Sequence, residues 1–246
     1  MAPIIKEVTT EAEFSGVVDC FWDANYNPYQ PIMNVLFPVY EATDEGYARA
    51  LAEAKNRLWA IHQSDPSSHW VYVTDDSDGK GEVYGGAHWN FHQTSPYKQG
   101  APELVASWYP EGEGRKFASR VLNQVYARRQ RLWRPHCQLN YMFTYSRQRG
   151  KGYGSMVMQW GMERADKMGL EVVVEASQYG VDLYDKFGLR SIEKVAIDMH
   201  IENPSNTWRR LESDLRDFSF WWMWKPHGDV YEAGKTPLPW VAKRDV

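Results

Sequence analysis

The amino-acid sequence predicts a mixed α/β fold, in which a central twisted sheet of about six to seven mixed strands is flanked by helices. Residues 69–74 and 82–92 have the composition of two strands, and the turn residues between them, at 75–81, indicate a hairpin. Residues 138–145 and 171–175 are also strand-like, but a Gly-rich turn and a helical segment separate them. Hairpins combined with strand–helix–strand units are typical of a mixed sheet with helices packed against it.

Apolar spacing, capping residues and turn residues place the other elements in order along the chain. Thr9 or Thr10 is a suitable N-cap for the first helix, and glycines at 169 and 188 are placed to end later helices. Prolines between residues 25 and 38 predict a loop there, with room for one helical turn. The expected strands span residues 4–8, 69–74, 82–92, 138–145, 171–175, 191–201 and 218–224. The expected helices span residues 11–23, 44–62, 117–133, 155–168 and 179–187, with irregular chain at 93–114 and in the tail at 227–246.

Composition and charge restrict the class of protein. The chain has 246 residues, of which 43% are hydrophobic and 15% aromatic; this excludes a disordered chain and favours one domain over residues 1–246. A net charge of -4 argues against a dedicated nucleic-acid binder. The sequence has no run of about 18 uncharged apolar residues that could span a membrane. Two cysteines form no disulfide framework and the N-terminus lacks the apolar core of a signal peptide, so we expect a cytoplasmic protein.

A turn with three glycines, Gly150, Gly152 and Gly154, follows the strand at 138–145 and opens the next helix. Glycines let backbone N–H groups approach a ligand closely, and a helix N-terminus carries a positive dipole end, so the turn suits an anion such as phosphate. The run lacks the Walker pattern, and Ser155 stands where a dinucleotide fingerprint needs its last glycine. The residues alone leave a phosphate site and a plain tight turn as alternatives.

Two motifs connect this turn to a known family. Residues 149–154 read Arg-x-x-Gly-x-Gly at a strand-to-helix junction, which resembles the acetyl-CoA signature of the GNAT family of acyltransferases. Residues 183–189 look like the family's Leu-Tyr-x-x-x-Gly-Phe element, with Leu189 in place of the usual Phe. The motif similarity covers residues 139–190, and the whole arrangement is similar to GNAT proteins of filamentous fungi. The resemblance implies the GNAT fold and direct transfer of an acetyl group from acetyl-CoA to an amine.

The resemblance also implies where the cofactor lies. The parallel strands at 139–145 and 171–175 would splay apart, with the acetyl-pantetheine arm in the opening. Backbone groups of Phe143 and Thr144 would bind the arm, and Ser177 stands where many relatives have an Asn that contacts the cofactor. The pyrophosphate would be bound by the backbone N–H groups of Arg149, Gly150, Lys151, Gly152, Tyr153, Gly154 and Ser155.

Two side chains are candidates for the proton transfers. Tyr184 matches the family's tyrosine beside the CoA sulfur, where a phenol can protonate the departing thiolate; an aromatic that packs on the sheet is the alternative. Glu175 ends a buried strand next to the splay and is the first candidate for the base that deprotonates the amine. An ion pair between Glu175 and a nearby Arg or Lys is an equal alternative, and Asp198 and His200, on one face of the next expected strand, are the runners-up.

Other polar groups receive a structural interpretation. His88 and His92 share a face of the hairpin strand, but no third ligand accompanies them, so we expect no metal. A position near the acceptor is the functional alternative for His88, although a packed histidine is favoured. The Arg-rich stretch at 128–134 is interpreted as a solvated helix face.

Aromatic residues in the segments that border the acceptor side of GNAT proteins favour a small-molecule amine as substrate. We expect Trp22, Tyr29, Trp89 and Trp108 to contact it. Acetylation of protein N-termini or lysines is the first alternative, and a non-catalytic CoA-binding module is the second. The expected partners are therefore acetyl-CoA and the amine, without nucleic acid or membrane, in a monomer or homodimer.

Overall fold

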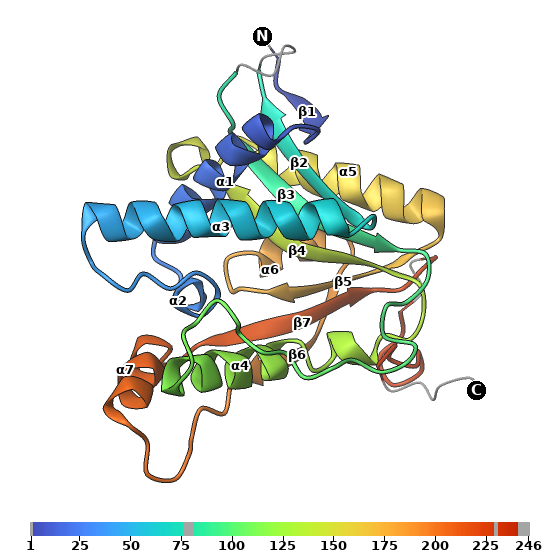
Figure 1. Ribbon diagram of the computed structural model, residues 1–246. Helices are drawn as coiled ribbons and strands as arrows, with labels where there is room; N and C mark the ends of the chain where they lie inside the picture. Colours follow the sequence, from blue (N-terminus) through green and yellow to red (C-terminus); the bar gives the residue numbers. More distant parts are fainter. Residues whose placement is uncertain (1, 76–80, 229–230, 241–246) are drawn as a thin grey trace.

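The computed structural model of the protein describes residues 2–75, 81–228 and 231–240. Its centre is a seven-stranded sheet in the order β1-β2-β3-β4-β5-β7-β6 (Figure 1). Neighbouring strands are antiparallel except β4 and β5, which run parallel, so the predicted mixed sheet is confirmed. The strands are β1 (Ile4–Glu7), β2 (Ser68–Thr74), β3 (Gly85–His92), β4 (His136–Thr144), β5 (Glu171–Ala176), β6 (Arg190–Ala196) and β7 (Ser219–Lys225). Residues 76–80 of the predicted turn, and 229–230 and 241–246 of the predicted tail, lie outside the described residues.

Helices connect most of these strands. Their bounds are α1 (Glu11–Tyr26), α2 (Ile32–Leu36), α3 (Asp44–Ser64), α4 (Glu113–Val125), α5 (Tyr153–Met168), α6 (Val181–Lys186) and α7 (Asn206–Asp214). Thr10 begins α1 with a capping box, in which its hydroxyl accepts from the N–H of Glu13 and the Glu13 carboxylate accepts from the N–H of Thr10. Gly169 ends α5 in the left-handed conformation, with a φ of 66°, as predicted.

Three segments differ from the sequence prediction. The helix expected at 117–133 begins earlier and ends at Val125, and a 3₁₀ turn at Arg129–Arg131 follows it. The strand expected at 191–201 ends at Ala196, because its neighbour β7 begins opposite that residue and offers no further partner. The sequence prediction did not include α7, whose N-cap is the hydroxyl of Ser205.

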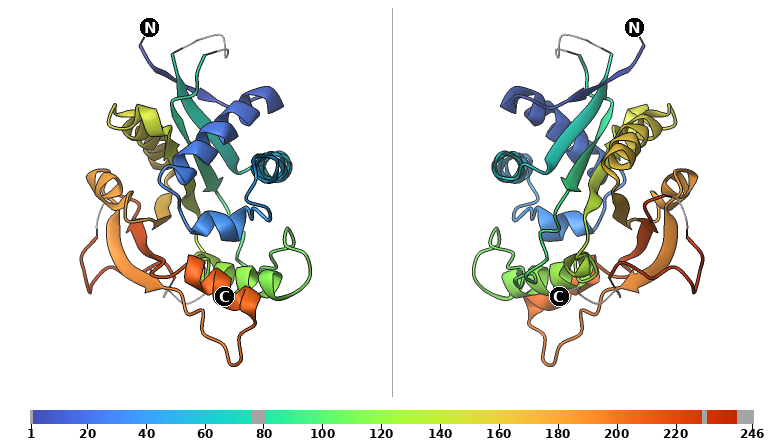
Figure 2. Two further views of the ribbon diagram at one scale, coloured as in Figure 1. Left: turned by 90° about the vertical axis from the view of Figure 1, so that its left-hand side faces the viewer. Right: turned by 90° about the vertical axis from the view of Figure 1, so that its right-hand side faces the viewer.

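Helices cover both faces of the sheet. Figure 2 shows α1 and α3 on one face and α5 on the other. Along β5, Val174 and Ala176 pack into the hydrophobic core under α5, whereas Glu175 lines a cavity on the opposite face. Neighbouring residues of this one strand therefore reach two different sides of the sheet, as the pleat of a strand requires.

The two parallel strands separate partway along their length. In the described part of the chain, the pairing of β4 with β5 ends at Leu139 and Val174. At the same level, the register of β3 with β4 shifts, because Trp89 pairs with Leu139 and His88 pairs with Tyr141. The residue between them, Asn140, is therefore the extra residue of a β-bulge, and a bulge bends the strand that contains it. The splay that the family resemblance implies is present at this bulge.

Two buried histidines make the stability of this fold sensitive to acid. His88 stacks on Trp70 at 4.5 Å, with its Nε2 at 2.9 Å from the Ser68 hydroxyl, and His136 is fully buried. Burial lowers the pKa of each imidazole from 6.5 to about 3, so both rings are neutral in the folded protein. Between pH 6.5, the pKa of a free imidazole, and pH 3, the unfolded chain binds more protons than the folded one. The contribution of these histidines to the free energy of unfolding is therefore fully present above pH 6.5 and decreases as the pH falls toward 3.

We therefore expect the free energy of unfolding to fall by up to about 1.4 kcal/mol per pH unit for each histidine in this window. Urea unfolding midpoints measured across the window would give the slope. A His88→Gln variant removes one of the two groups and should flatten the slope, whereas His200→Gln, at an exposed ring, should not. Equal slopes in the His88→Gln variant and the unchanged protein would show that His88 does not contribute to the pH dependence of stability.

Candidate active site

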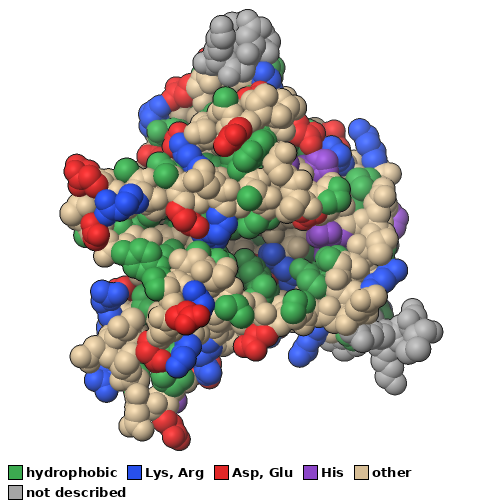
Figure 3. Space-filling model, in the orientation of Figure 1, with side chains coloured by type: hydrophobic (Ala, Val, Ile, Leu, Met, Phe, Trp, Pro, Cys, Tyr) green, Lys and Arg blue, Asp and Glu red, His purple; other side chains and the backbone are tan. Residues whose placement is uncertain are grey.

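A cavity of about 140 Å³ lies where β4 and β5 separate, on the side of the sheet opposite α5. Figure 3 shows this face of the molecule, which is hollowed between α3 and α4 and bordered there by hydrophobic side chains. Side chains from α2, α4, β4 and β7 form most of the wall. The lining residues are Ile32, Leu36, Leu122, Val125, Tyr126, Arg129, Asn140, Tyr141, Glu175, Ser177, Phe218 and Phe220.

A buried ion pair forms the charged part of this cavity. Arg129 Nη2 lies 2.5 Å from Glu175 Oε2, and its Nε lies 3.1 Å from Oε1, so the contact is bidentate. The two side chains are only 11% and 8% exposed. Arg129 also donates to the side-chain oxygen of the bulge residue Asn140 at 2.9 Å, and its guanidinium stacks 4.2 Å above the Tyr126 ring. The pair is therefore fixed to the point where the strands separate.

The ion pair corrects one interpretation and agrees with another. The Arg-rich stretch at 128–134 is not simply a solvated face, because Arg129 points inward, while Arg128 pairs with Glu193 nearer the surface. The partner that the sequence left open for Glu175 is Arg129. Burial raises the pKa of the Glu175 carboxyl above its usual value, although the Arg129 charge opposes this rise.

The Gly-rich turn lies at the N-terminus of α5. Gly150 and Gly152 have φ values of 78° and 87°, which a residue with a side chain rarely adopts, and a Cβ at either would meet open space. No side chain caps α5, so its first-turn N–H groups at Tyr153, Gly154 and Ser155 have no side-chain partner among the described residues. Uncapped amides at a helix N-terminus suit an anion, so the turn fits a pyrophosphate.

The basic residues of this turn are partly engaged within the protein. Arg149 Nη2 donates to the carbonyl of Ala24 at the end of α1, at 2.8 Å. Lys151 Nζ lies 2.6 Å from the side-chain oxygen of Gln148 and is exposed. Arg149 thereby fixes the turn to α1, and its backbone remains in the loop where the resemblance puts the pyrophosphate.

A charge at the start of α5 tests this site without harming the fold. We expect a Ser155→Glu variant to bind CoA at least about tenfold more weakly, because a carboxylate beside the first-turn amides would repel phosphate. The same carboxylate should leave the helix as stable or more stable, by about 0.3–1 kcal/mol. Calorimetry with CoA and thermal unfolding would measure the two effects, and Ser191→Glu, an exposed position on β6, is the matched control. Unchanged CoA affinity in the Ser155→Glu variant would contradict a site here.

Tyr184 lies on the α5 side of the sheet. Its side chain is 6% exposed and packs in the same core as Ala176. A Cβ at Gly180 would lie 2.5 Å from the Tyr184 ring, so only glycine allows the ring this position. Burial raises the pKa of the phenol, which keeps its proton at neutral pH. The structure therefore shows the packing alternative, and the phenol keeps the proton that an acid would donate.

The other expected cofactor residues divide between the two faces. The Phe143 ring is buried in the core under α1, and Phe143 and Thr144 pair with Gly86 and Gly85 of β3. They lie beyond the last pair of β4 with β5, so their backbone borders the opening. Ser177 is exposed and lines the cavity on the side of Glu175.

The four aromatic residues expected to contact the acceptor are not brought together. Trp89 is fully buried, with its indole against Gly161 of α5, so the structure does not support its role as a contact. Trp22 stacks on Tyr26 at 4.9 Å, and Tyr29 is 46% exposed at a separate surface hollow. Trp108 borders another hollow beside α3. None of the four is among the described residues that line the cavity at the splay.

Trp108 instead helps to position the cavity wall. α2, which contributes Ile32 and Leu36 to the wall, has three carbonyl groups that accept from side chains elsewhere in the chain. Trp108 Nε1 donates to the carbonyl of Val35 at 2.9 Å, and Arg57 donates to that of Leu36 at 2.6 Å. Tyr109 donates its hydroxyl hydrogen to the carbonyl of Asn34. These bonds join the irregular segment and α3 to the five-residue helix.

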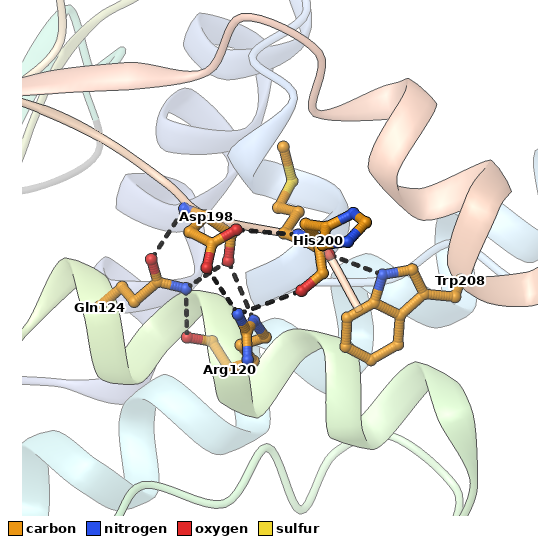
Figure 4. Close-up of polar contacts among 6 residues, drawn as sticks. Arg120, Gln124, Asp198, His200 and Trp208 are labelled. Atoms are coloured by element: carbon orange, nitrogen blue, oxygen red, sulfur yellow. Dashed lines mark hydrogen bonds and ion pairs between the residues drawn. The ribbon is translucent and has the colours of Figure 1, made fainter. Parts of the chain in front are cut away.

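The runners-up for the base lie elsewhere. Asp198 Oδ2 accepts from Arg120 at 2.8 Å, and the backbone N–H of Asp198 donates to Gln124, so Asp198 joins the chain after β6 to α4 (Figure 4). His200 donates its backbone N–H to the Asp198 carboxylate, and both side chains are exposed. They do not share the face of a strand, because β6 ends at Ala196.

The histidine pair of β3 is also accounted for. His88 is packed against Trp70, as favoured from the sequence, and its Nδ1 has no hydrogen-bond partner among the described residues. The His92 ring lies 5.0 Å from that of His136. No group of three His, Cys, Asp or Glu side chains that could hold a metal occurs in the described residues.

Most of the cavity wall has no signal in the sequence. Four aromatic residues of its wall, Tyr126, Tyr141, Phe218 and Phe220, come from three parts of the chain that are far apart in the sequence. The sequence predicts a strand at 218–224, and an alternating apolar strand has the same pattern whether its side chains meet other side chains or a cavity. One available signal was Glu175, a carboxylate that directly follows three buried valines and requires a partner.

Comparisons with known proteins agree with this arrangement. A profile of the acetyltransferase (GNAT) family matches residues 29–189, which is more than half of the chain. No curated protein matches the sequence. Among the described residues, no helix is both long enough and apolar enough to cross a membrane.

Several solved structures share the fold. A histone acetyltransferase HPA2 and related acetyltransferase from Corynebacterium glutamicum has a TM-score of 0.56 at 20% identity, over 93% of this chain and 98% of that one. A Drosophila melanogaster polyamine N-acetyltransferase has a TM-score of 0.56 at 14% identity, over 91% and 97%. A mosquito arylalkylamine N-acetyltransferase like 5b has a TM-score of 0.53 at 12% identity, over 91% and 99%. With the family profile covering the turn, the splay and Tyr184, the chain belongs to the acetyltransferase (GNAT) family of acyltransferase enzymes.

Proposed function

We propose that the protein is an acetyl-CoA-dependent N-acetyltransferase whose acceptor is a small-molecule amine. One observation carries the proposal: a cavity with a buried carboxylate opens at the splay, on the face of the sheet opposite α5. A donor on one side of the opening and an acceptor on the other can meet between the strands. Direct transfer needs such proximity, which supplies a large share of the rate.

The residues on the α5 side fit the cofactor. When bound, acetyl-CoA supplies an activated acetyl thioester. The first-turn amides of α5 and the backbone of Gly150 and Gly152 would hold its pyrophosphate. Backbone groups of Phe143 and Thr144, past the end of the β4–β5 pairing, would orient the arm. Tyr184 holds a proton at its phenol oxygen on this side and would give it to the thiolate.

The residues on the cavity side suit the amine. Glu175 would take the proton that an ammonium must lose before it can attack, and its raised pKa makes it a better base than an ordinary carboxylate. Arg129 fixes the orientation of that carboxylate through two hydrogen bonds. The proposed base would then lie on the cavity side of the sheet and the proposed acid on the α5 side.

The size of the cavity favours a small acceptor. Its volume of about 140 Å³ is below the roughly 300–1,000 Å³ that sites for drug-sized ligands occupy. α2 and α4 wall it on two sides, whereas a protein substrate needs an open groove for an extended chain. The structural relatives include proteins described as polyamine and arylalkylamine N-acetyltransferases as well as a histone acetyltransferase, so the choice rests on the cavity.

A panel of small primary amines, incubated with acetyl-CoA and followed by thiol release, tests the function. Peptides with a free N-terminus or an internal lysine belong in the same panel. Turnover of amines is the expected result. Turnover of peptides without turnover of any small amine would overturn the small-molecule assignment.

Glu175→Gln tests the assignment of the base. We expect kcat at neutral pH to fall about tenfold, since water can replace a missing base in part, and the rise of kcat/KM with pH to be lost. Glu193→Gln, which removes the surface partner of Arg128, is the matched control. A pH profile that keeps its rising limb in the Glu175→Gln variant would place the base elsewhere.

A further inference from the structure

The cavity has an unusual balance of charge. Among its described lining residues only Arg129 and Glu175 are charged, and they neutralise each other through the bidentate contact. The remaining wall is apolar or aromatic except for Asn140 and Ser177, and Asn140 already accepts from Arg129. No carboxylate of the described lining is therefore left to pair with a second cation.

The position of Arg129 makes the cavity still less favourable for a second cation. Its guanidinium covers one face of the Tyr126 ring, which removes that face from contact with a ligand. A second ammonium in the cavity would also meet the positive charge of Arg129 and lose its water against apolar side chains. Such desolvation of an unpaired charge is costly.

We propose that the acceptor is a monoamine with an apolar body, and that Arg129 excludes diamines because its positive charge repels their second ammonium. This inference rests on the proposed function, because it concerns the substrate class of the same site. The amine nitrogen reaches Glu175 at the splay, and the apolar body lies against Leu122, Phe218 and Phe220. A diamine of the same length would place its second charge on this wall.

Pentylamine and putrescine form a matched pair for the test, because they have the same number of heavy atoms and differ by a terminal methyl in place of an ammonium. We expect the unchanged protein to favour pentylamine in kcat/KM by at least about tenfold. Arg129→Gln removes this positive charge from the cavity, so the ratio should move toward putrescine by about tenfold. Arg129→Lys keeps the charge and should keep the preference, and Arg128→Gln removes only the neighbouring surface pair.

The outcomes separate this inference from the proposed function. Acetylation of neither amine, nor of any other small amine, would overturn the proposed function itself. Acetylation with putrescine preferred by the unchanged protein would overturn the monoamine assignment and leave the function standing. An Arg129→Gln variant that binds CoA normally but keeps the original ratio would remove Arg129 from the selection. If the Arg129→Gln variant does not fold, the test uses the unchanged protein and Arg129→Lys. A preference for pentylamine in both proteins supports the proposal. Loss of that preference in Arg129→Lys overturns the role of Arg129.

Discussion

Replacing Tyr184 by Phe is expected to lower kcat by about 10²-fold, within the range that one proton-transfer group supplies. The variant removes a single oxygen from a ring that packs closely on Gly180. The core around the ring keeps its shape, so folding stability and CoA affinity should stay near those of the unchanged protein. Steady-state thiol release would give kcat, and calorimetry would give the affinity.

Tyr179→Phe is the control for this experiment. Tyr179 is 65% exposed and precedes the same short helix, so its hydroxyl has no buried role. We expect its kcat to stay within about twofold of the unchanged protein. A Tyr184→Phe variant with equally small effects would show that another group protonates the leaving thiolate.

The largest expected effect on stability comes from Gly161→Ala in α5. In most helix interiors this change stabilises by up to about 1 kcal/mol, because alanine has the higher helix propensity. Here a Cβ would lie 2.3 Å from the indole of Trp89, and both residues are buried. We expect a loss of about 1–3 kcal/mol, as for other overpacked cores. Urea unfolding with an unchanged m-value would measure it.

Gly16→Ala in α1 gives the opposite sign and makes a matched control. Its Cβ would lie 3.8 Å from Val83, which is ordinary van der Waals contact, so we expect a gain rather than a loss. Smaller side chains at Trp89 should restore part of the stability of the Gly161→Ala variant. Stabilisation by Gly161→Ala alone would contradict the close approach of α5 to β3.

The cofactor side of the site could be predicted from the sequence because its signals are local. The turn at 149–154 combines a strand end, glycines and a helix start within a few residues, and the structure has that order. The acceptor side could not, because its wall comes from α2, α4, β4 and β7, which only tertiary packing brings together. Trp89 illustrates the difficulty, since β3 is buried on both faces and its pattern does not say which side a residue faces. Arg129 looked solvated because its partner lies 46 residues further along the chain.

The attachment of α2 has a consequence for how this enzyme can diverge. The helix has five residues, fewer than a helix needs for stability of its own, and its last carbonyls bond to Tyr109, Trp108 and Arg57. None of these three donors lies on the strands that carry the chemistry. Substitutions at the donors can therefore shift Ile32 and Leu36 and reshape the acceptor site while β4, β5 and α5 stay unchanged. On the proposed function, new acceptor preferences can arise in this scaffold without mutations at Glu175 or Tyr184.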